Sequence, residues 1–97
     1  MSIGISRVDF VGLPTRDLAT AVAFYGETLG LPCSVHMPER NFAEFETGNL
    51  TLNVYNPAQM GLEHHALRNP LALHVDDVAA ARAELEAAGV AFAMDTF

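Results

Sequence analysis

The hydrophobic and polar positions of the chain follow two different periods, which separates candidate strands from candidate helices. The apolar run Val8–Leu13 is too short for a helix and ends at Pro14, so it predicts a strand. Over residues 18–29, apolar side chains recur three and four positions apart, which places them on one face of a helix. Asp17 stands at the N-cap position of this helix, and Gly30 is its expected C-cap.

Three alternating segments follow the helix and predict three more strands. They are Pro32–Met37, Asn41–Thr47 and Leu50–Tyr55, and the turn-forming pair Gly48-Asn49 separates the last two. Short connections favour an antiparallel meander with one face packed on a helix. In the first of these strands, the alternation places His36 on the face that the helix does not cover.

The opening pattern returns in the second half of the chain, which indicates an internal duplication. Asp77 matches Asp17, and residues 71–75 repeat the pattern of the strand predicted before Asp17. Asp77 would cap a second helix, which Gly89 closes, and Val90–Met94 would form the next strand. Coincidence is the alternative, because any strand followed by an alanine-rich helix gives a similar pattern. We favour duplication.

The repeat divides the chain into modules. Residues 1–56 are expected to form a first βαβββ module, residues 57–69 a linker, and residues 70–97 the start of a second module that lacks its last strands. The expected fold class is α+β. Its tandem βαβββ modules would form a cup-shaped, mixed but mostly antiparallel sheet with the helices outside.

Composition narrows the possible functions. The 97 residues are 51% hydrophobic and carry a net charge of −7, so the chain can form a packed core. The acid excess argues against partners such as nucleic acid or an anionic membrane surface. The lone Cys33 allows no internal disulfide and is expected to be buried or half-buried. No signal peptide or bilayer-spanning run is recognisable, so the expected location is cytoplasmic.

Several of these residues resemble a known family. The segments Val11–Leu18, Ala23–Tyr25 and Leu29–Leu31 are similar to the first module of the vicinal oxygen chelate superfamily, and 75–90 is similar to the start of its second module. This superfamily includes glyoxalase I, extradiol dioxygenases, and the bleomycin and fosfomycin resistance proteins. The resemblance covers nearly the whole chain and implies a fold, but this fold supports many reactions.

The resemblance also implies a divalent metal, held by four ligands that are mostly His and Glu. The corresponding positions here are Phe10, Asn53 and Pro70, and a fourth that lies beyond Phe97. Phenylalanine and proline side chains cannot coordinate a metal, and an amide oxygen is a weak ligand beside a carboxylate. We therefore expect no metal and no other cofactor. A displaced site built from His36, His74, Glu44 and Glu46 is the alternative.

The residues expected on the cup face predict a ligand pocket instead. Aromatic side chains would supply stacking surface, and a few polar groups would orient the ligand. Carboxylates above aromatic rings suit a cationic or planar molecule. The expected ligand-binding residues are Phe10, His36, Phe42, Glu44, Glu46, Asn53, Tyr55 and His74.

The hypothesis for function is a metal-independent protein that binds a small molecule and resembles the bleomycin-resistance branch. Such a protein sequesters an aromatic or cationic ligand without bond chemistry. Two alternatives remain open: a metal-dependent lyase, isomerase or dioxygenase of the same superfamily, and a non-catalytic interaction subunit. A homodimer is also expected, because exposed sheet edges need to be covered.

Overall fold

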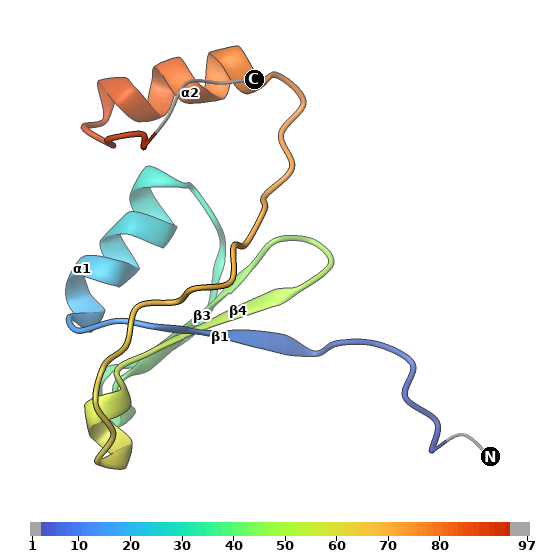
Figure 1. Ribbon diagram of the computed structural model, residues 1–97, viewed down its shortest axis with the longest axis vertical. Helices are drawn as coiled ribbons and strands as arrows, with labels where there is room; N and C mark the ends of the chain where they lie inside the picture. Colours follow the sequence, from blue (N-terminus) through green and yellow to red (C-terminus); the bar gives the residue numbers. More distant parts are fainter. Residues whose placement is uncertain (1–2, 94–97) are drawn as a thin grey trace.

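A mixed four-stranded sheet organises the first half of the chain (Figure 1). The computed structural model describes residues 3–93. The strands lie in the order β1-β4-β3-β2; β1 runs parallel to β4, and the other two pairs are antiparallel. The predicted α+β class and the meander are therefore confirmed. The bounds of the strands are β1 Phe10–Pro14, β2 Cys33–Met37, β3 Phe42–Glu46 and β4 Thr51–Tyr55.

Strand β1 begins two residues later than the apolar pattern predicts. Its partner β4 begins at Thr51, which lies opposite Phe10, so Val8 and Asp9 pair with no strand among residues 3–93. Pro14 closes β1 opposite Tyr55 and is tolerated there because β1 is an edge strand.

The first predicted helix is confirmed, together with its cap. Helix α1 (Leu18–Ala23) begins after Asp17, whose Oδ1 accepts a hydrogen bond from the backbone N–H of Thr20 at 3.1 Å. It continues as the π-helical segment η1 (Phe24–Thr28). Gly26 lies within η1, where a Cβ would come 3.3 Å from Cε1 of Phe45. A larger residue at this position would press against the Phe45 ring, so glycine fits here although it lowers the stability of the helix.

The hydrophobic core lies between α1 and one face of the sheet. Alternate residues of β3 and β4 face the helix and are fully buried, as the alternation predicts. The ring of Tyr25 packs on Phe45 with centroids 5.7 Å apart, and burial raises the pKa of the Tyr25 phenol. The buried residues are Leu13, Leu18, Ala21, Ala43, Phe45, Leu52 and Val54.

Two 3₁₀ turns flank one end of the sheet. Segment η2 (Pro38–Arg40) joins β2 to β3, and η3 (Pro57–Met60) follows β4. Asn41 ends η2 in the left-handed conformation, with φ at 61°. The backbone N–H of Asn56 donates to the carbonyl of Asn41 at 3.0 Å, so the two turns are tied together.

The second half of the chain contains one helix, α2 (Val78–Ala87). Its predicted cap is confirmed, because Oδ1 of Asp77 accepts from the N–H of Ala80 at 3.0 Å. Unlike α1, this helix has no buried residue among those described. Figure 1 shows α2 beyond the end of α1, away from the sheet.

Two strand predictions in this half are wrong. Residues 71–75 form no strand, and residues 90–93 form none either, whereas Met94 lies outside the described residues. A strand requires a hydrogen-bonded neighbour, and neither segment pairs with one within residues 3–93. The apolar alternation of Leu71, Leu73 and Val75 is present, but these side chains are 39–44% exposed.

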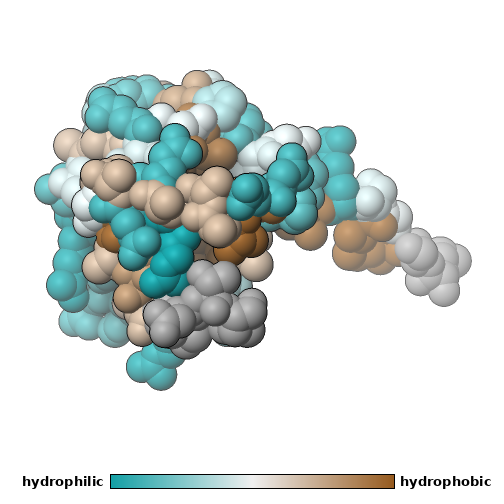
Figure 2. Space-filling view, turned by 90° about the horizontal axis from the view of Figure 1, so that it is seen from above, coloured by the Kyte–Doolittle hydropathy of each residue, from teal (hydrophilic) through white to brown (hydrophobic). Residues whose placement is uncertain are grey.

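The segment before β1 projects from the body of the molecule. Its apolar side chains Ile3, Ile5 and Val8 are 67–88% exposed, and Figure 2 shows brown apolar surface along the projecting arm. In the part of the chain that the structure describes, no helix has the length and apolarity to cross a membrane.

Candidate functional site

The face of the sheet opposite α1 carries three rows of side chains. Strand register places Phe42 beside Tyr55, Glu44 beside Asn53, and Glu46 beside Thr51. On the neighbouring strand, Phe10 lies opposite Thr51 and Gly12 opposite Asn53. The alternation therefore assigned the residues of β1, β3 and β4 to the correct face.

A hollow of about 420 Å³ opens on this face, between the sheet and the two 3₁₀ turns. Its volume lies within the range typical of small-molecule sites. The floor comes from β1, β3 and β4, and the walls come from η2 and η3 with the residues that flank them. The lining residues are Phe10, Gly12, Arg40, Asn41, Phe42, Asn53, Tyr55, Asn56, Gln59 and Met60.

The aromatic floor of the hollow depends on a close approach between two strands. A Cβ at Gly12 would stand 3.1 Å from Cε1 and 3.7 Å from Cδ1 of Tyr55. Glycine at this position therefore lets the Tyr55 ring lie against the floor of the hollow. Phe42 lies beside Tyr55 in the sheet, and Phe10 comes from the far edge with 57% of its surface exposed.

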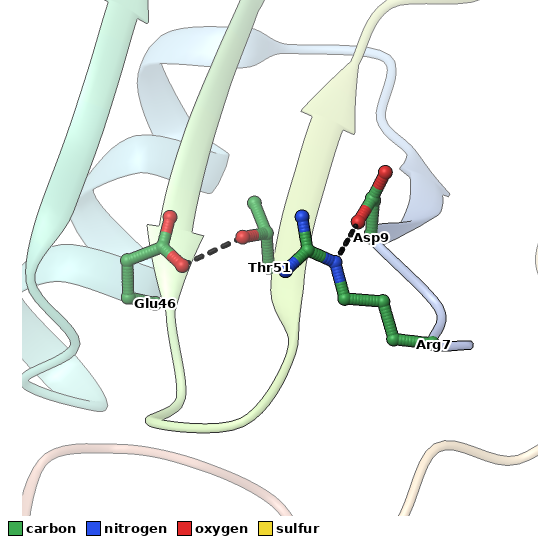
Figure 3. A network of polar contacts seen from close by, with 4 residues as sticks. All are labelled: Arg7, Asp9, Glu46 and Thr51. Carbon is green, nitrogen blue, oxygen red and sulfur yellow. Dashed lines mark hydrogen bonds and ion pairs between the residues drawn. The ribbon is translucent and has the colours of Figure 1, made fainter.

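The two glutamates of this face are held by donors from the sheet itself. Asn53 Nδ2 donates to Glu44 Oε2 at 2.9 Å. Glu46 accepts from Ser34 Oγ at 2.5 Å. It also accepts from Thr51 Oγ1 at 2.6 Å, a bond that Figure 3 shows. The bonds from Ser34 and Thr51 lower the pKa of Glu46, because they favour the charged form. Neither carboxylate lines the hollow.

The prediction that His36 lies on this face is wrong. A register shift in β2 between Cys33 and Val35 breaks the alternation. Val35 consequently lies opposite Glu44, and His36 lies opposite the buried Ala43, on the face that α1 covers. Periodicity cannot detect such a bulge, because one extra residue reverses the faces of all that follow.

His74 is also away from the predicted pocket. It lies in the unpaired segment 71–75, where its side chain is 88% exposed and its Nε2 is 3.5 Å from Oδ1 of Asp76. Together with α2, this segment lines a larger hollow of about 1050 Å³ beside the end of η1. The structure therefore brings together Phe10, Phe42, Asn53 and Tyr55, with Glu44 and Glu46 adjacent, but not the two histidines.

Sequence reasoning missed the wall residues Arg40, Gln59 and Met60. All three lie in 3₁₀ turns between or after strands, and Met60 is 61% exposed. The available signals were Pro38 and Pro57, which begin these turns, and the polar Asn41 and Asn56 beside them. Such signals mark a turn but do not show which face of the sheet it borders.

The donor set does not fit the metal that the resemblance implies. At two of the corresponding positions stand Phe10, which has no donor atom, and Asn53, whose amide is hydrogen-bonded to Glu44. Pro70 lies outside any strand. Across residues 3–93, no group of three or more His, Cys, Asp or Glu side chains could hold a metal ion. The alternative metal site would combine His36 and His74 with Glu44 and Glu46, but neither histidine lies on the face of the sheet that carries the two glutamates.

Cys33 differs from the expectation of burial, because its side chain is exposed at the start of β2. Its thiol donates to the carbonyl of Val35 at 3.3 Å. This contact lies beside the register shift, and Cys33 does not line the hollow on the open face.

Comparisons with known proteins agree with this architecture. Among solved structures, the chain is similar to lactoylglutathione lyase from Agrobacterium tumefaciens, with 23% identity and a TM-score of 0.70, covering 94% of this chain and 76% of that one. A glyoxalase/bleomycin resistance protein/dioxygenase from Nocardioides is 25% identical with a TM-score of 0.70, at 96% and 68% coverage. An integron cassette protein of V. cholerae is 21% identical with a TM-score of 0.64, at 98% and 77% coverage.

The search of curated proteins found no match. A family model does match, and it spans residues 7–96. This range includes the whole βαβββ unit and the capped helix α2. The chain therefore belongs to the glyoxalase/bleomycin resistance protein/dioxygenase superfamily.

Proposed function

We propose that the chain binds a small, planar aromatic molecule in the hollow on the open face of the sheet. The convergence of Phe10, Phe42 and Tyr55 on one hollow is the observation that carries this proposal. Aromatic rings bind flat ligands by offset or edge-to-face stacking, and they lose little conformational entropy on binding. Asn53 and Gln59 add polar groups that can orient the ligand.

The kinds of side chain in the hollow favour binding over bond chemistry. Apart from the hydroxyl of Tyr55, its polar lining consists of amides and Arg40, and neither an amide nor a guanidinium acts as a general base at neutral pH. The carboxylates of Glu44 and Glu46 already accept hydrogen bonds from their neighbours. The proposed role is sequestration of the ligand.

Metal analysis separates this proposal from a metal-dependent lyase, isomerase or dioxygenase. The donor set predicts that the purified protein holds no stoichiometric transition metal after exposure to zinc, iron or nickel salts. Elemental analysis of the dialysed protein measures this directly. One metal ion per chain would contradict metal-independent binding.

Titration with indole tests the binding proposal itself. The chain has no Trp, so indole fluorescence excited beyond the tyrosine absorption band reports only on the ligand. Phe42→Ala is expected to weaken indole binding, because it removes one aromatic ring from the floor of the hollow. Phe92→Ala is the matched control, since Phe92 lies after α2 beneath the guanidinium of Arg82. Equal binding by both variants would overturn the proposal.

We also propose that the protein is a homodimer. Within residues 3–93, one edge of β1 pairs with no strand, and apolar side chains are exposed on the arm before it and along 71–75. An open strand edge is a template for pairing with another chain, and large exposed apolar patches mark protein–protein interfaces.

A further inference from the structure

The charge distribution around the hollow narrows the class of ligand. The net charge of −7 would by itself favour a cation. Within residues 3–93, however, Arg40 is the one charged side chain that lines the hollow. We infer that the ligand is an aromatic molecule bearing an acidic group, and that Arg40 binds this group. The inference rests on the proposed function and deepens it.

Arg40 is available to a ligand. Its side chain is exposed, and no carboxylate in the described part of the chain forms an ion pair with it. A guanidinium presents a planar set of donors that matches a carboxylate in a two-bond arrangement. A bound acid would therefore give Arg40 the partner that the described residues do not provide.

The backbone beneath Arg40 is held in a defined position. Arg40 is the last residue of η2, and the next residue, Asn41, donates its N–H to the carbonyl of Pro38 at 3.0 Å. The carbonyl of Asn41 in turn accepts from the N–H of Asn56, which caps η3. Arg40 therefore stands on a turn fastened to the opposite wall of the hollow, a site suited to a fixed anchor.

The nearby carboxylates do not form a binding site for a cation in this hollow. Glu44 is bonded to Asn53, and Glu46 accepts from Ser34 and Thr51 two rows away from Phe42 and Tyr55. Asn56 also uses both ends of its amide, accepting from Ala58 and donating to the carbonyl of Arg16. The polar groups around the hollow thus leave Arg40 as its charged anchor.

Three indole derivatives that differ in charge test this inference: indole-3-acetate, indole-3-acetamide and tryptamine. At neutral pH and low salt, the protein is expected to bind the acid about fivefold more tightly than the amide, the upper value for an exposed ion pair. Tryptamine is expected to bind most weakly. Arg40→Gln should abolish the preference for the acid, measured as the ratio of the acid and amide affinities. Arg68→Gln, which removes the same charge from the linker, should preserve that preference.

The outcomes distinguish the two proposals. Equal binding of acid and amide, tightest binding of tryptamine, or an unchanged preference in Arg40→Gln would overturn the acidic-ligand inference and leave the aromatic site intact. If none of the three compounds binds, or if Phe42→Ala binds all three as tightly as the unmodified protein does, both the aromatic site and the acidic-ligand inference are overturned. Circular dichroism of Arg40→Gln confirms that the variant is folded.

Discussion

The ring of Tyr55 lies against Gly12 on the neighbouring strand, so that a Cβ at Gly12 would stand 3.1 Å from Cε1 of Tyr55. These residues belong to β4 and β1, the parallel pair at one side of the sheet. Glycine normally weakens a strand interior, and here its small size lets an aromatic ring line the hollow. A residue with a side chain at position 12 would favour the strand, whereas glycine is needed for the Tyr55 ring to line the hollow.

Gly12→Ala tests this conflict. The new methyl group must displace the Tyr55 ring by a few tenths of an ångström, and overpacking of this kind costs about 1 kcal/mol in the free energy of unfolding. In a Tyr55→Ala background the same change should stabilise the protein by about 0.5 kcal/mol, because alanine has less backbone entropy to lose than glycine. Urea denaturation of the four proteins measures both effects. Destabilisation of equal size in the two backgrounds would refute the proposed contact.

The hydrogen bonds to Glu46 predict a pH dependence. Because its pKa is lowered in the folded state, Glu46 stabilises the protein above the ordinary glutamate pKa, and this contribution is lost as pH falls through the lowered value. In Ser34→Ala combined with Thr51→Val, the Glu46 pKa should rise toward the ordinary value. Carbon-13 NMR titration of the side-chain carboxyl measures it. Ser6→Ala, outside the sheet, should leave the titration unchanged, and an unaltered pKa in the double variant would contradict the assignment.

The two N-caps predict different consequences for the same substitution. Asp17→Ala should cost about 1 kcal/mol of global stability, because α1 covers the core. Asp77→Ala should loosen α2 with little effect on the urea midpoint, since no described residue of α2 is buried. Hydrogen exchange resolves the local effect. A loss of global stability in Asp77→Ala equal to that in Asp17→Ala would show that α2 is part of the main cooperative unit.

The proposed homodimer is tested by size-exclusion chromatography with light scattering. At micromolar concentration the mass should be twice the 10.4 kDa of one chain. Each chain carries a net charge of −7, so added salt should strengthen the association by screening the repulsion between the two copies. A monomer at all salt concentrations would contradict the proposal.

Local rules predicted the elements whose neighbours lie close in sequence. Helix α1 with its Asp17 cap, and the faces of β3 and β4, follow from periodicity because each pattern has one buried side. The register shift after Cys33 was not predictable, since a bulge leaves the apolar pattern of β2 unchanged while moving His36 to the other face.

Long-range strand pairing and the position of the turns relative to the sheet could not be predicted from the sequence. Residues 71–75 have the alternation of a strand, yet a strand forms only where another one pairs with it. The aromatic part of the site was predictable from strand faces, but Arg40 was not. Its role depends on η2 being fastened to η3 through Asn41 and Asn56, a contact between residues that are distant in sequence.

Mapping where an aromatic ligand contacts the protein decides whether it binds in the hollow on the open face of the sheet. Nitrogen-15 NMR of the uniformly labelled protein, titrated with indole-3-acetate, reports on each backbone amide. The largest shifts are expected to cluster at Gly12, Asn53, Tyr55 and Gln59, around the hollow of about 420 Å³. Shifts confined to the larger hollow beside α2, for example at Leu73 and Leu85, or no specific shifts at all, would contradict it.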